Sequence, residues 1–242
     1  MTVLITGASR GIGAAAAILF ARHGYRVVVN YARDEEAARA VVQRIERAGG
    51  EAIAVQGDVA VEADVVRLFN EAGVADCLVN NAGITGGFSL AADVATGAVE
   101  RMLAVNVLGP ILCSREAVRR MSTKYGGKGG CIVNVSSLVA RTGGSGEWVH
   151  YAASKGAVNS LTIGLAREVA EEGIRVNAVA PGLIETDLHA TNGRPDRLAK
   201  MAPAIPMRRP GSAEEVAEAI YWLASPAASY VTGTILEVGG GR

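Results

Sequence analysis

The 242-residue sequence has no excess of charge of either sign, since 24 lysines and arginines balance 24 aspartates and glutamates. A chain without a basic excess has no electrostatic attraction for nucleic acid or for an anionic membrane, so we expect neither partner. No apolar run approaches the roughly 20 residues that span a bilayer. The N-terminal sequence MTVLITGASRG lacks a basic segment followed by an apolar one and a cleavage site, so we expect no secretion signal and a cytoplasmic location.

Cysteine is scarce as well. The three cysteines, Cys77, Cys113 and Cys131, are an odd number without the spacing of a metal site, and each stands among apolar residues. This pattern indicates buried free thiols in a reducing compartment, with no disulfide framework and no metal centre.

Short β-branched runs alternate with longer helical patterns along the whole chain. Such alternation, with almost continuously apolar strands, is typical of a parallel sheet covered by helices on both faces. Amphipathic stretches at 34–48, with Asp34 as N-cap, and at 158–172 are typical of its helices. No internal repeat, low-complexity tract or linker is present, so we predict one α/β domain, 1–242, with a doubly wound, Rossmann-type sheet. Its seven predicted strands are 2–6, 26–31, 52–56, 76–80, 131–136, 175–180 and 234–238.

The longest segment without a clear pattern is 183–212, which is rich in proline and contains glycine. Long irregular segments in compact domains are usually functional. This one follows a predicted strand, and ligands of open α/β sheets bind beyond the carboxyl ends of the strands. We therefore predict a substrate loop that closes over the active site.

A glycine-rich turn, TGASRGIG at 6–13, joins the first strand to a helix. Gly7 permits the tight turn, Gly11 lets the backbone approach a pyrophosphate, and Gly13 lets the helix pack on the strand. The free amides of the helix N-terminus then face the phosphates. The spacing is G-x-x-x-G-x-G instead of the standard G-x-G-x-x-G. The turn predicts a dinucleotide, although a tight strand–helix turn could use glycines for geometry alone.

The end of the second strand bears on which dinucleotide is bound. NAD-binding chains carry an acidic residue there for the ribose 2′-hydroxyl, whereas this sequence has Asn30 and Tyr31. Arg33 follows, and Arg10 lies in the glycine loop, so two guanidinium groups are available for a 2′-phosphate. The alternative is that both arginines are solvated and that 34–36 is an ordinary acidic first helical turn. We favour NADP over NAD.

Tyr151 and Lys155 in HYAASK are four positions apart, which places both on one face of a helix. A free phenol titrates near pH ~10, so a pKa near neutrality requires a shift that corresponds to about 4 kcal/mol. A unit charge ~4 Å away at an effective dielectric constant of ~20 supplies about that much. The pair is therefore interpreted as a tuned acid, with Lys155 sufficient to lower the pKa of Tyr151.

Together with NNAG (80–83), VNVLG (105–109), IVNVSS (132–137), RVNAVAPG (175–182) and VTGTILEVGGG (231–241), these motifs make the chain resemble the short-chain dehydrogenase/reductase family along its whole length. Within the family it is similar to the group of 3-oxoacyl-acyl-carrier-protein reductases and glucose 1-dehydrogenases. The resemblance implies a small-molecule carbonyl or alcohol substrate and a homotetramer.

The resemblance also implies residue roles. Tyr151 would be the general acid in reduction and the base in oxidation, and Lys155 would also hydrogen-bond the nicotinamide ribose. Ser137 would hold the substrate oxygen, and Asn106 would position a water in the proton relay. Cofactor contacts are expected from Gly7, Ser9, Arg10, Gly11, Ile12, Gly13, Asn30, Arg33, Asp58, Val59, Asn80, Ala82, Gly83, Tyr151, Lys155, Pro181, Gly182, Ile184 and Thr186.

Some features depart from the family pattern or compete with it. Ser136 and Ser137 would face opposite sides of a strand, and the family favours Ser137. The fourteen positions from Ser137 to Tyr151 are about one more than usual, which affects the substrate mouth, and the chain is about five residues short between 58 and 80. His150 and His189 lack a recognisable carboxylate partner, so neither is predicted to be catalytic, although His150 could line the substrate mouth.

These observations predict an NADP(H)-dependent oxidoreductase that acts on a carbonyl or a secondary alcohol. A dedicated 3-oxoacyl-carrier reductase is the main alternative. Lys124 and Lys128 could help dock its acidic carrier, whereas Glu171 and Glu172 stand where further basic contacts would be expected. A non-catalytic nucleotide-sensing module is a second alternative, but such proteins usually lose the tyrosine or the lysine. A nucleotide-sugar epimerase fits poorly, because its extra substrate domain is missing.

Overall fold

The strands form a single parallel sheet in this computed structural model, which describes residues 1–186 and 196–242. The strand order is β3-β2-β1-β4-β5-β6-β7, and every neighbouring pair is parallel. The prediction of a doubly wound seven-stranded sheet is confirmed. The strands are β1 Thr2–Ile5, β2 Arg26–Tyr31, β3 Ala52–Gln56, β4 Cys77–Asn80, β5 Gly130–Val135, β6 Ile174–Pro181 and β7 Ile235–Val238.

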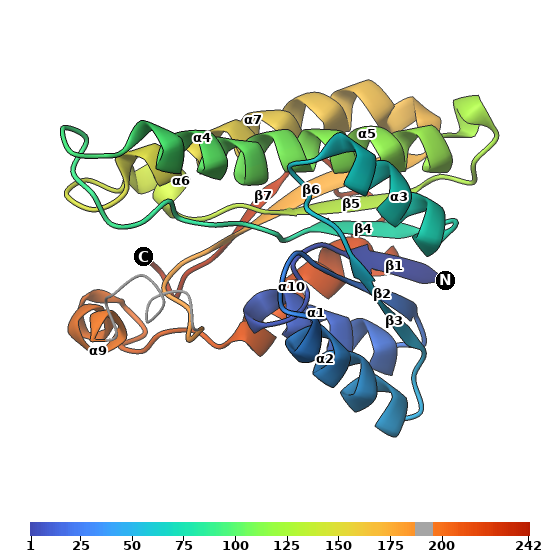
Figure 1. Cartoon of the computed structure of the whole chain (residues 1–242), viewed down its shortest axis with the longest axis horizontal. Coiled ribbons are helices and arrows are strands. Elements are labelled where there is room, and N and C mark those ends of the chain that lie inside the picture. Colours follow the sequence, from blue (N-terminus) through green and yellow to red (C-terminus); the bar gives the residue numbers. More distant parts are fainter. Residues whose placement is uncertain (187–195) are drawn as a thin grey trace.

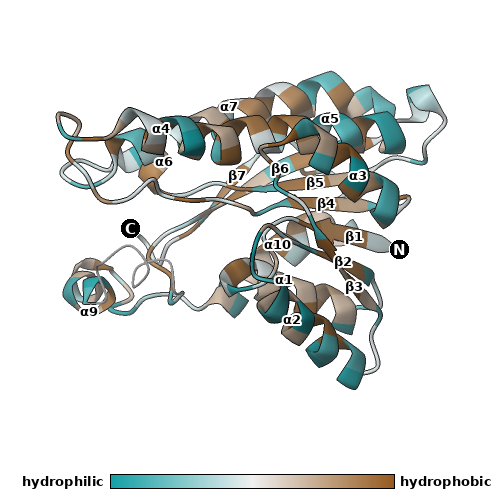
Figure 2. Ribbon diagram, in the orientation of Figure 1, coloured by the Kyte–Doolittle hydropathy of each residue, from teal (hydrophilic) through white to brown (hydrophobic). Residues whose placement is uncertain are grey.

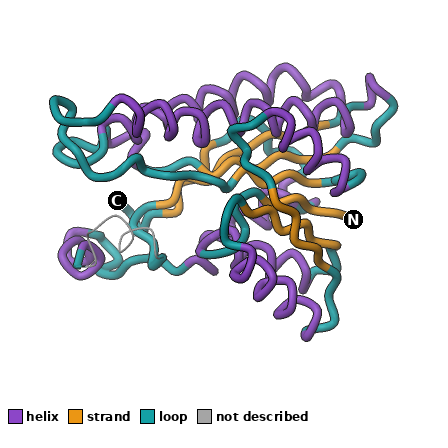
Figure 3. Tube along the Cα trace, in the orientation of Figure 1, coloured by secondary structure: helices purple, strands orange, loops and turns teal. Residues whose placement is uncertain are grey.

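Helices cover both faces of the sheet (Figures 1 and 3). On one face lie α1 Gly11–Arg22, α2 Glu35–Arg47 and α10 Ala213–Ala224. On the other lie α3 Glu62–Ala72, α4 Thr96–Leu103, α5 Gly109–Met121 and α7 Val149–Val169. Shorter elements are the π-helix η1 Ala104–Leu108, the helices α6 Val139–Thr142 and α9 Arg197–Met201, and the 3-10 turns Thr123–Tyr125, Ala170–Glu172, Ala202–Ala204 and Pro226–Ala228.

Two apolar cores explain why the strands are apolar along their length (Figure 2). Val3 and Ile5 of β1 point into the core beneath α1 and α2, whereas Leu4 points into the core beneath α3 and α5. Because successive strand residues face opposite sides, both parities must be apolar when both faces are buried. All three side chains have 0% exposure.

The predicted helices are present with small changes in their ends. The carboxylate of Asp34 accepts a hydrogen bond from the amide of Ala37 at 3.0 Å, so Asp34 is the N-cap of α2 as predicted. The stretch predicted at 158–172 belongs to the longer helix α7, which already begins at Val149. Tyr151 therefore lies in the first turn of α7, at the carboxyl edge of the sheet.

The segment 183–212 is less irregular than its sequence suggests. It contains α9 and a 3-10 turn, and its two ends are joined where Ile184 pairs with Gly211. The amide of Gly211 donates to the carbonyl of Leu183 at 2.9 Å, and Glu185 donates back to Gly211 at 2.8 Å. His189 lies outside the described residues.

One helical run differs from the expectation of no membrane-length apolar segment. Residues 96–121 reach the length and, at 1.2, the mean hydropathy of a spanning helix, with 39% of the apolar window buried in the protein. A core helix of a water-soluble protein passes the same test, so this is weak evidence for a membrane. The run packs on the sheet and leaves Leu103, Leu108 and Ile111 exposed by 42–43%.

Candidate active site

Tyr151 is held in an aromatic cluster at the carboxyl edge of the sheet. Its side chain is 8% exposed and packs with Trp148 and Met102, which are 5% and 0% exposed. The rings of Trp148 and Tyr151 meet edge to face with centroids 5.4 Å apart. This packing fixes the phenol and keeps bulk water from most of its ring.

The two serines after β5 point in different directions. Ser136 is 3% exposed, and its hydroxyl donates to Oδ1 of Asn159 at 2.6 Å inside the protein. Ser137 is half-buried and lies near the phenol of Tyr151, whose pKa it lowers, and its hydroxyl donates to the carbonyl of Pro181 at 3.5 Å. The Ser137 oxygen also accepts from the amide of Val139 at 3.2 Å, which orients it. Ser137 therefore faces Tyr151, as predicted from the family pattern.

Lys155 lies one helical turn after Tyr151, on the same face. It is only 4% exposed, and its ammonium lies 5.7 Å from the centroid of the Tyr151 ring. Nζ donates to the carbonyl of Val135 at 2.8 Å, at the end of β5. Burial lowers the pKa of Lys155 to about 8.

The prediction that Lys155 alone brings the phenol near neutrality is wrong for this structure. Burial raises the pKa of Tyr151 to about 12, and the nearby Ser137 hydroxyl offsets this only in part. The physical reason is desolvation, which disfavours both phenolate and ammonium, while the ammonium is engaged by Val135. At neutral pH the phenol is protonated and is thus poised as an acid.

Asn106 joins this group from the π-helix η1. Its side chain accepts from the amide of Ile84 at 2.9 Å and donates to the carbonyl of the same residue at 2.8 Å. A Cβ atom on Gly83 would come within 3.4 Å of Asn106 Oδ1 and 3.5 Å of Lys155 Nζ. Asn106 therefore fixes the turn after β4 so that its backbone passes close to the lysine.

The glycine turn forms a cradle without room for side chains. Gly7 has φ +61° and lies against the backbone of Ala82, where a Cβ would approach Cα to 2.9 Å. At Gly13 a Cβ would lie 2.5 Å from Asn81 Nδ2 and 2.6 Å from the Gly7 carbonyl oxygen. Within the described residues, helix α1 has no side-chain cap at Arg10, so its first amides remain available to an anion. These features fit the pyrophosphate of a dinucleotide.

Residues distant in sequence complete the rim of the cradle. A Cβ on Gly11 would lie 3.4 Å from Cγ2 of Thr186, so the segment after β6 lies over the glycine turn. Gly182 packs against Gly239, where a Cβ would come within 2.8 Å of the Gly239 Cα. Pro181 and Ile184 are buried beside them. Of the predicted residues in 181–186, the structure thus brings Thr186 to the glycine turn.

Comparison with known proteins agrees with this geometry. Residues 7–242 match the family model described as enoyl-(acyl carrier protein) reductase. An uncharacterized oxidoreductase of Escherichia coli, YgfF, is 50% identical over 99% of this chain and 98% of its own length. A short-chain dehydrogenase/reductase of Mycobacterium marinum superposes with a TM-score of 0.92 at 36% identity, over 99% of this chain and 94% of that one. A blue fluorescent protein from a metagenomic library, solved with NADPH, superposes with a TM-score of 0.89 at 33% identity, over 99% of this chain and 96% of that one.

The chain belongs to the short-chain dehydrogenase/reductase family. It is therefore an NAD(P)-dependent oxidoreductase.

Two predicted cofactor residues of this oxidoreductase point into the scaffold instead. Asn30 is 1% exposed; its Oδ1 accepts from the Gly7 amide at 3.2 Å and its Nδ2 donates to Gly57 at 3.0 Å. Asn80 is 4% exposed, and its Nδ2 donates to Oδ1 of Asn134 at 2.9 Å. The side chains of Asn30 and Asn80 thus support the site from behind.

Asn81, which was not predicted, has a direct part in shaping the glycine cradle. Its Nδ2 donates to the carbonyls of Thr6 and Gly7, both at 2.9 Å. The doubled asparagine in NNAG was the available signal, because neighbours at a strand end face opposite ways. Their opposite orientations follow from this spacing: Asn80 faces the scaffold and Asn81 faces the glycine turn.

Two of the three charged residues predicted at the adenosine end of the groove, Arg10 and Asp58, already form ion pairs. Arg10 forms an ion pair with Asp34 at 3.1 Å, with side chains 54% and 41% exposed. Arg33 is exposed just after β2. Asp58 pairs with Arg101 at 2.7 Å, and the neighbouring Val59 is 5% exposed. Ser9 and Ile12 are half-buried in the glycine turn.

His150 has a structural partner in the loop after β4. Its Nε2 hydrogen-bonds the carbonyl of Thr85 at 3.1 Å, and a Cβ on Gly86 would lie 3.3 Å from the imidazole ring. The ring thus holds the loop after β4 against the start of α7. This contact gives His150 a structural role, in line with the prediction that it is not catalytic.

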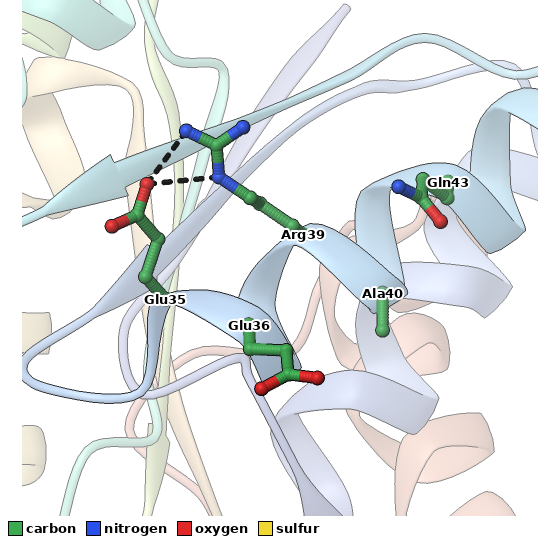
Figure 4. A pocket seen from close by; sticks show the side chains of 5 residues that line it. All are labelled: Glu35, Glu36, Arg39, Ala40 and Gln43. Atoms are coloured by element: carbon green, nitrogen blue, oxygen red, sulfur yellow. Dashed lines mark hydrogen bonds and ion pairs between the residues drawn. The ribbon is translucent and has the colours of Figure 1, made fainter.

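The hollow in Figure 4 is unrelated to this site. It has a volume of about 500 Å³ and is lined by Glu35, Glu36, Arg39, Ala40 and Gln43. These residues belong to α2, on the face of the sheet opposite α7. The Arg39–Glu35 ion pair at 2.6 Å closes one side of the hollow and is largely solvated. Its lining shares no residue with the group around Tyr151.

Lys155 gives the oxidoreductase a specific pH dependence of stability. Its pKa falls from 10.5 to about 8 on folding, so between those pH values the unfolded chain binds more protons than the folded one. Stability should therefore rise with pH in this window, because the full penalty for a buried charge is present only below about pH 8. Lys155→Met lacks the titrating ammonium and therefore this rise of stability with pH. The variant's free energy of unfolding relative to wild type should thus fall by up to about 3 kcal/mol from pH ~7 to pH ~10.

Urea denaturation of both proteins measures this difference. The range must end near pH ~10, because the raised pKa of Tyr151 stabilises the fold below its unfolded value of 10.0 and loses that effect toward about 12. Lys200→Met is a matched control, since Lys200 is 74% exposed. Parallel curves for wild type and Lys155→Met would contradict the prediction.

Proposed function

We propose that this protein is an NADP(H)-dependent oxidoreductase that transfers a hydride between the nicotinamide and a carbonyl or secondary alcohol, with Tyr151 as general acid and base. The observation that carries this proposal is the meeting of Ser137, Tyr151, Lys155 and Asn106 beside Gly83. They lie at the carboxyl edge of the sheet, where the glycine cradle also opens. When bound, the nicotinamide supplies or accepts the hydride.

In reduction, Tyr151 gives its proton to the oxygen of the substrate carbonyl. A pKa of about 12 keeps this proton in place at neutral pH until charge develops on that oxygen. The Ser137 hydroxyl, which lies near the phenol, holds the same oxygen and aligns it. In oxidation these groups work in reverse, and Tyr151 takes the proton of the alcohol.

In this proposal Lys155 supplies protons, and Asn106 positions the backbone beside it. With a pKa of about 8, Lys155 exchanges its proton readily near neutral pH, as a member of a proton relay must. Asn106 fixes the Ile84 backbone through two hydrogen bonds, which keeps Gly83 close to the ammonium. We propose that a relay water lies among these groups.

The direct test is oxidation of NADPH in the presence of a panel of ketones, aldoses and an acetoacetyl thioester. Consumption of NADPH that depends on one of these carbonyl compounds supports the proposal. Absence of consumption with every member, in a protein shown to bind NADPH, contradicts it.

A dedicated acyl-carrier reductase is the second candidate, supported by the description of the matching family model. Its predicted docking residue Lys124 lies 3.9 Å from Glu172, an ion pair that removes much of the net charge offered to an acidic carrier. Preference for the thioester over plain ketones in the same panel would favour this candidate.

We further propose that Arg10 provides preference for NADP over NAD. Its guanidinium lies at the surface beside the glycine turn, where a 2′-phosphate could replace or share the Asp34 contact. Arg10→Ala is expected to lower kcat/KM for NADPH by about 10- to 100-fold and to leave NADH nearly unchanged.

Steady-state kinetics with both cofactors tests this preference. Asp34→Asn should raise the ratio of kcat/KM for NADPH to kcat/KM for NADH, because it frees Arg10 from its ion pair. Arg39→Ala is a control, since Arg39 pairs with Glu35 on α2 and is 69% exposed. An equal loss with both cofactors in Arg10→Ala would assign the arginine a general structural role.

We also propose a cytoplasmic homotetramer. The buried free thiols Cys77, Cys113 and Cys131 suit a reducing compartment. Leu103, Leu108 and Ile111 on the α4–α5 run form an exposed apolar strip that a second copy could cover. Size-exclusion chromatography with light scattering should give four times the 24.9 kDa chain mass, and a monomer would contradict this expectation.

A further inference from the structure

Arg197, the first residue of α9, reaches from the substrate segment to the aromatic cluster around Tyr151. Helix α9 and the short helix α6 lie on opposite sides of the carboxyl ends of the strands (Figure 1). The Arg197 guanidinium nevertheless lies over the ring of Trp148 at 4.7 Å and over that of Phe88 at 5.6 Å. This one side chain therefore joins α9 to the aromatic cluster around Tyr151.

The bridge is buried and incompletely hydrogen-bonded. The Arg197 side chain is 12% exposed, and its Nη1 forms an ion pair with Glu147. Its Nε is fully buried and has no hydrogen-bond partner among the residues that the structure describes. A buried N–H of a charged group without an acceptor is costly, so an acceptor supplied by a ligand would relieve that cost.

The ring of Trp148 links Arg197 to Tyr151, because it contacts both side chains. Trp148 contacts Arg197 on its face and Tyr151 at 5.4 Å, and Phe88 packs on Trp148 at 4.5 Å.

We infer that Arg197 is a specificity-determining residue that donates its Nε–H to a second oxygen of the substrate, one that takes no part in hydride transfer. Because Glu147 neutralises the guanidinium, this second oxygen belongs to an uncharged acceptor such as an ester or amide carbonyl. A carboxylate would be repelled by Glu147. The preferred substrates are thus neutral ketones or alcohols with an additional carbonyl acceptor. This inference rests on the proposed function.

Matched probes separate recognition from a structural role. The neutral keto esters ethyl acetoacetate and ethyl levulinate offer the acceptor at two spacings, and 2-heptanone and 2-octanone are their analogues without it. In Arg197→Met, kcat/KM for the better keto ester should fall by about 10- to 100-fold, mainly through KM, with little change for the plain ketones. Lys200→Met, on the exposed side of the same helix, should change neither.

The charge argument is tested by acetoacetate, the anionic analogue. Wild type should use it less well than its ethyl ester, and Glu147→Gln should reverse part of that preference by leaving Arg197 with net charge. Equal losses of kcat/KM for keto esters and plain ketones in Arg197→Met would overturn the inference. A wild type that prefers acetoacetate to its ethyl ester would overturn it as well.

Binding without turnover distinguishes this inference from the proposed function. The chain has two tryptophans, so Trp222→Phe leaves Trp148 as the single fluorescent reporter beside Arg197. Tighter binding of the keto ester than of its plain analogue, lost on Arg197→Met, supports the inference even if no NADPH is consumed. NADPH consumption together with equal binding of both probes would support the function and overturn the role of Arg197.

Discussion

Replacement of Tyr151 by phenylalanine is expected to reduce kcat by about 100- to 10,000-fold in both reaction directions. The change removes the only proton that the phenol can give, while the ring keeps its edge-to-face contact with Trp148 at 5.4 Å. Loss of a positioned acid or base typically has an effect of this size. NADPH oxidation measures kcat, and NADPH fluorescence measures cofactor binding, which should change little.

A matched control is Tyr125→Phe, which alters an exposed tyrosine, 60% accessible, after α5. It should retain wild-type activity and stability. A Tyr151→Phe variant that turns over at more than a few per cent of the wild-type rate would show that another group carries the proton.

Substitution of Gly13 by alanine is expected to be the most damaging single methyl addition in the cofactor cradle. The new Cβ would lie 2.6 Å from the Gly7 carbonyl oxygen and 2.9 Å from the Ala8 Cα, both of which are backbone atoms. Backbone cannot rotate away, so α1 must shift from β1 or the turn must open. We expect a loss of about 1–3 kcal/mol in unfolding free energy and at least a tenfold weaker NADPH affinity.

Gly97→Ala is the corresponding control for this substitution. Gly97 lies on the exposed side of α4, a Cβ there would meet no atom of the described residues within 4 Å, and its φ is not positive. Alanine there should stabilise the helix by up to about 1 kcal/mol. Denaturation curves and NADPH titration of both variants provide the test. Wild-type stability and affinity in Gly13→Ala would show that the cradle is looser than its contacts indicate.

Much of the fold could be predicted because its signals are local. The β-branched runs identify strands whose ends differ from the observed ones by about one residue, and Asp34 caps α2 as its side-chain chemistry suggests. The glycine turn is equally local, since positive φ at Gly7 and Gly11 requires that residue type.

The assignment of asparagines illustrates where local reasoning fails. Asn30 and Asn80 stand at strand ends beside the cofactor groove, but a strand buried on both faces gives no apolar–polar alternation from which to assign a side. Their amides are instead buried at 1% and 4% exposure and hold the scaffold together. Asn81, one residue later, faces the glycine turn.

The sequence by itself determined the strand–helix order and the glycine cradle, because each depends on residue type and short-range spacing. The spacing of Tyr151 and Lys155 placed them on one helix face, whereas Ser137 and Asn106 were proposed from the family resemblance. Only the tertiary structure decided the protonation of Tyr151, since desolvation depends on Trp148, Met102 and other neighbours that packing brings around the phenol. It also decided the partners of Arg10 and Arg197. Charge pairing and burial arise where separate elements meet, and no local pattern in the chain specifies them.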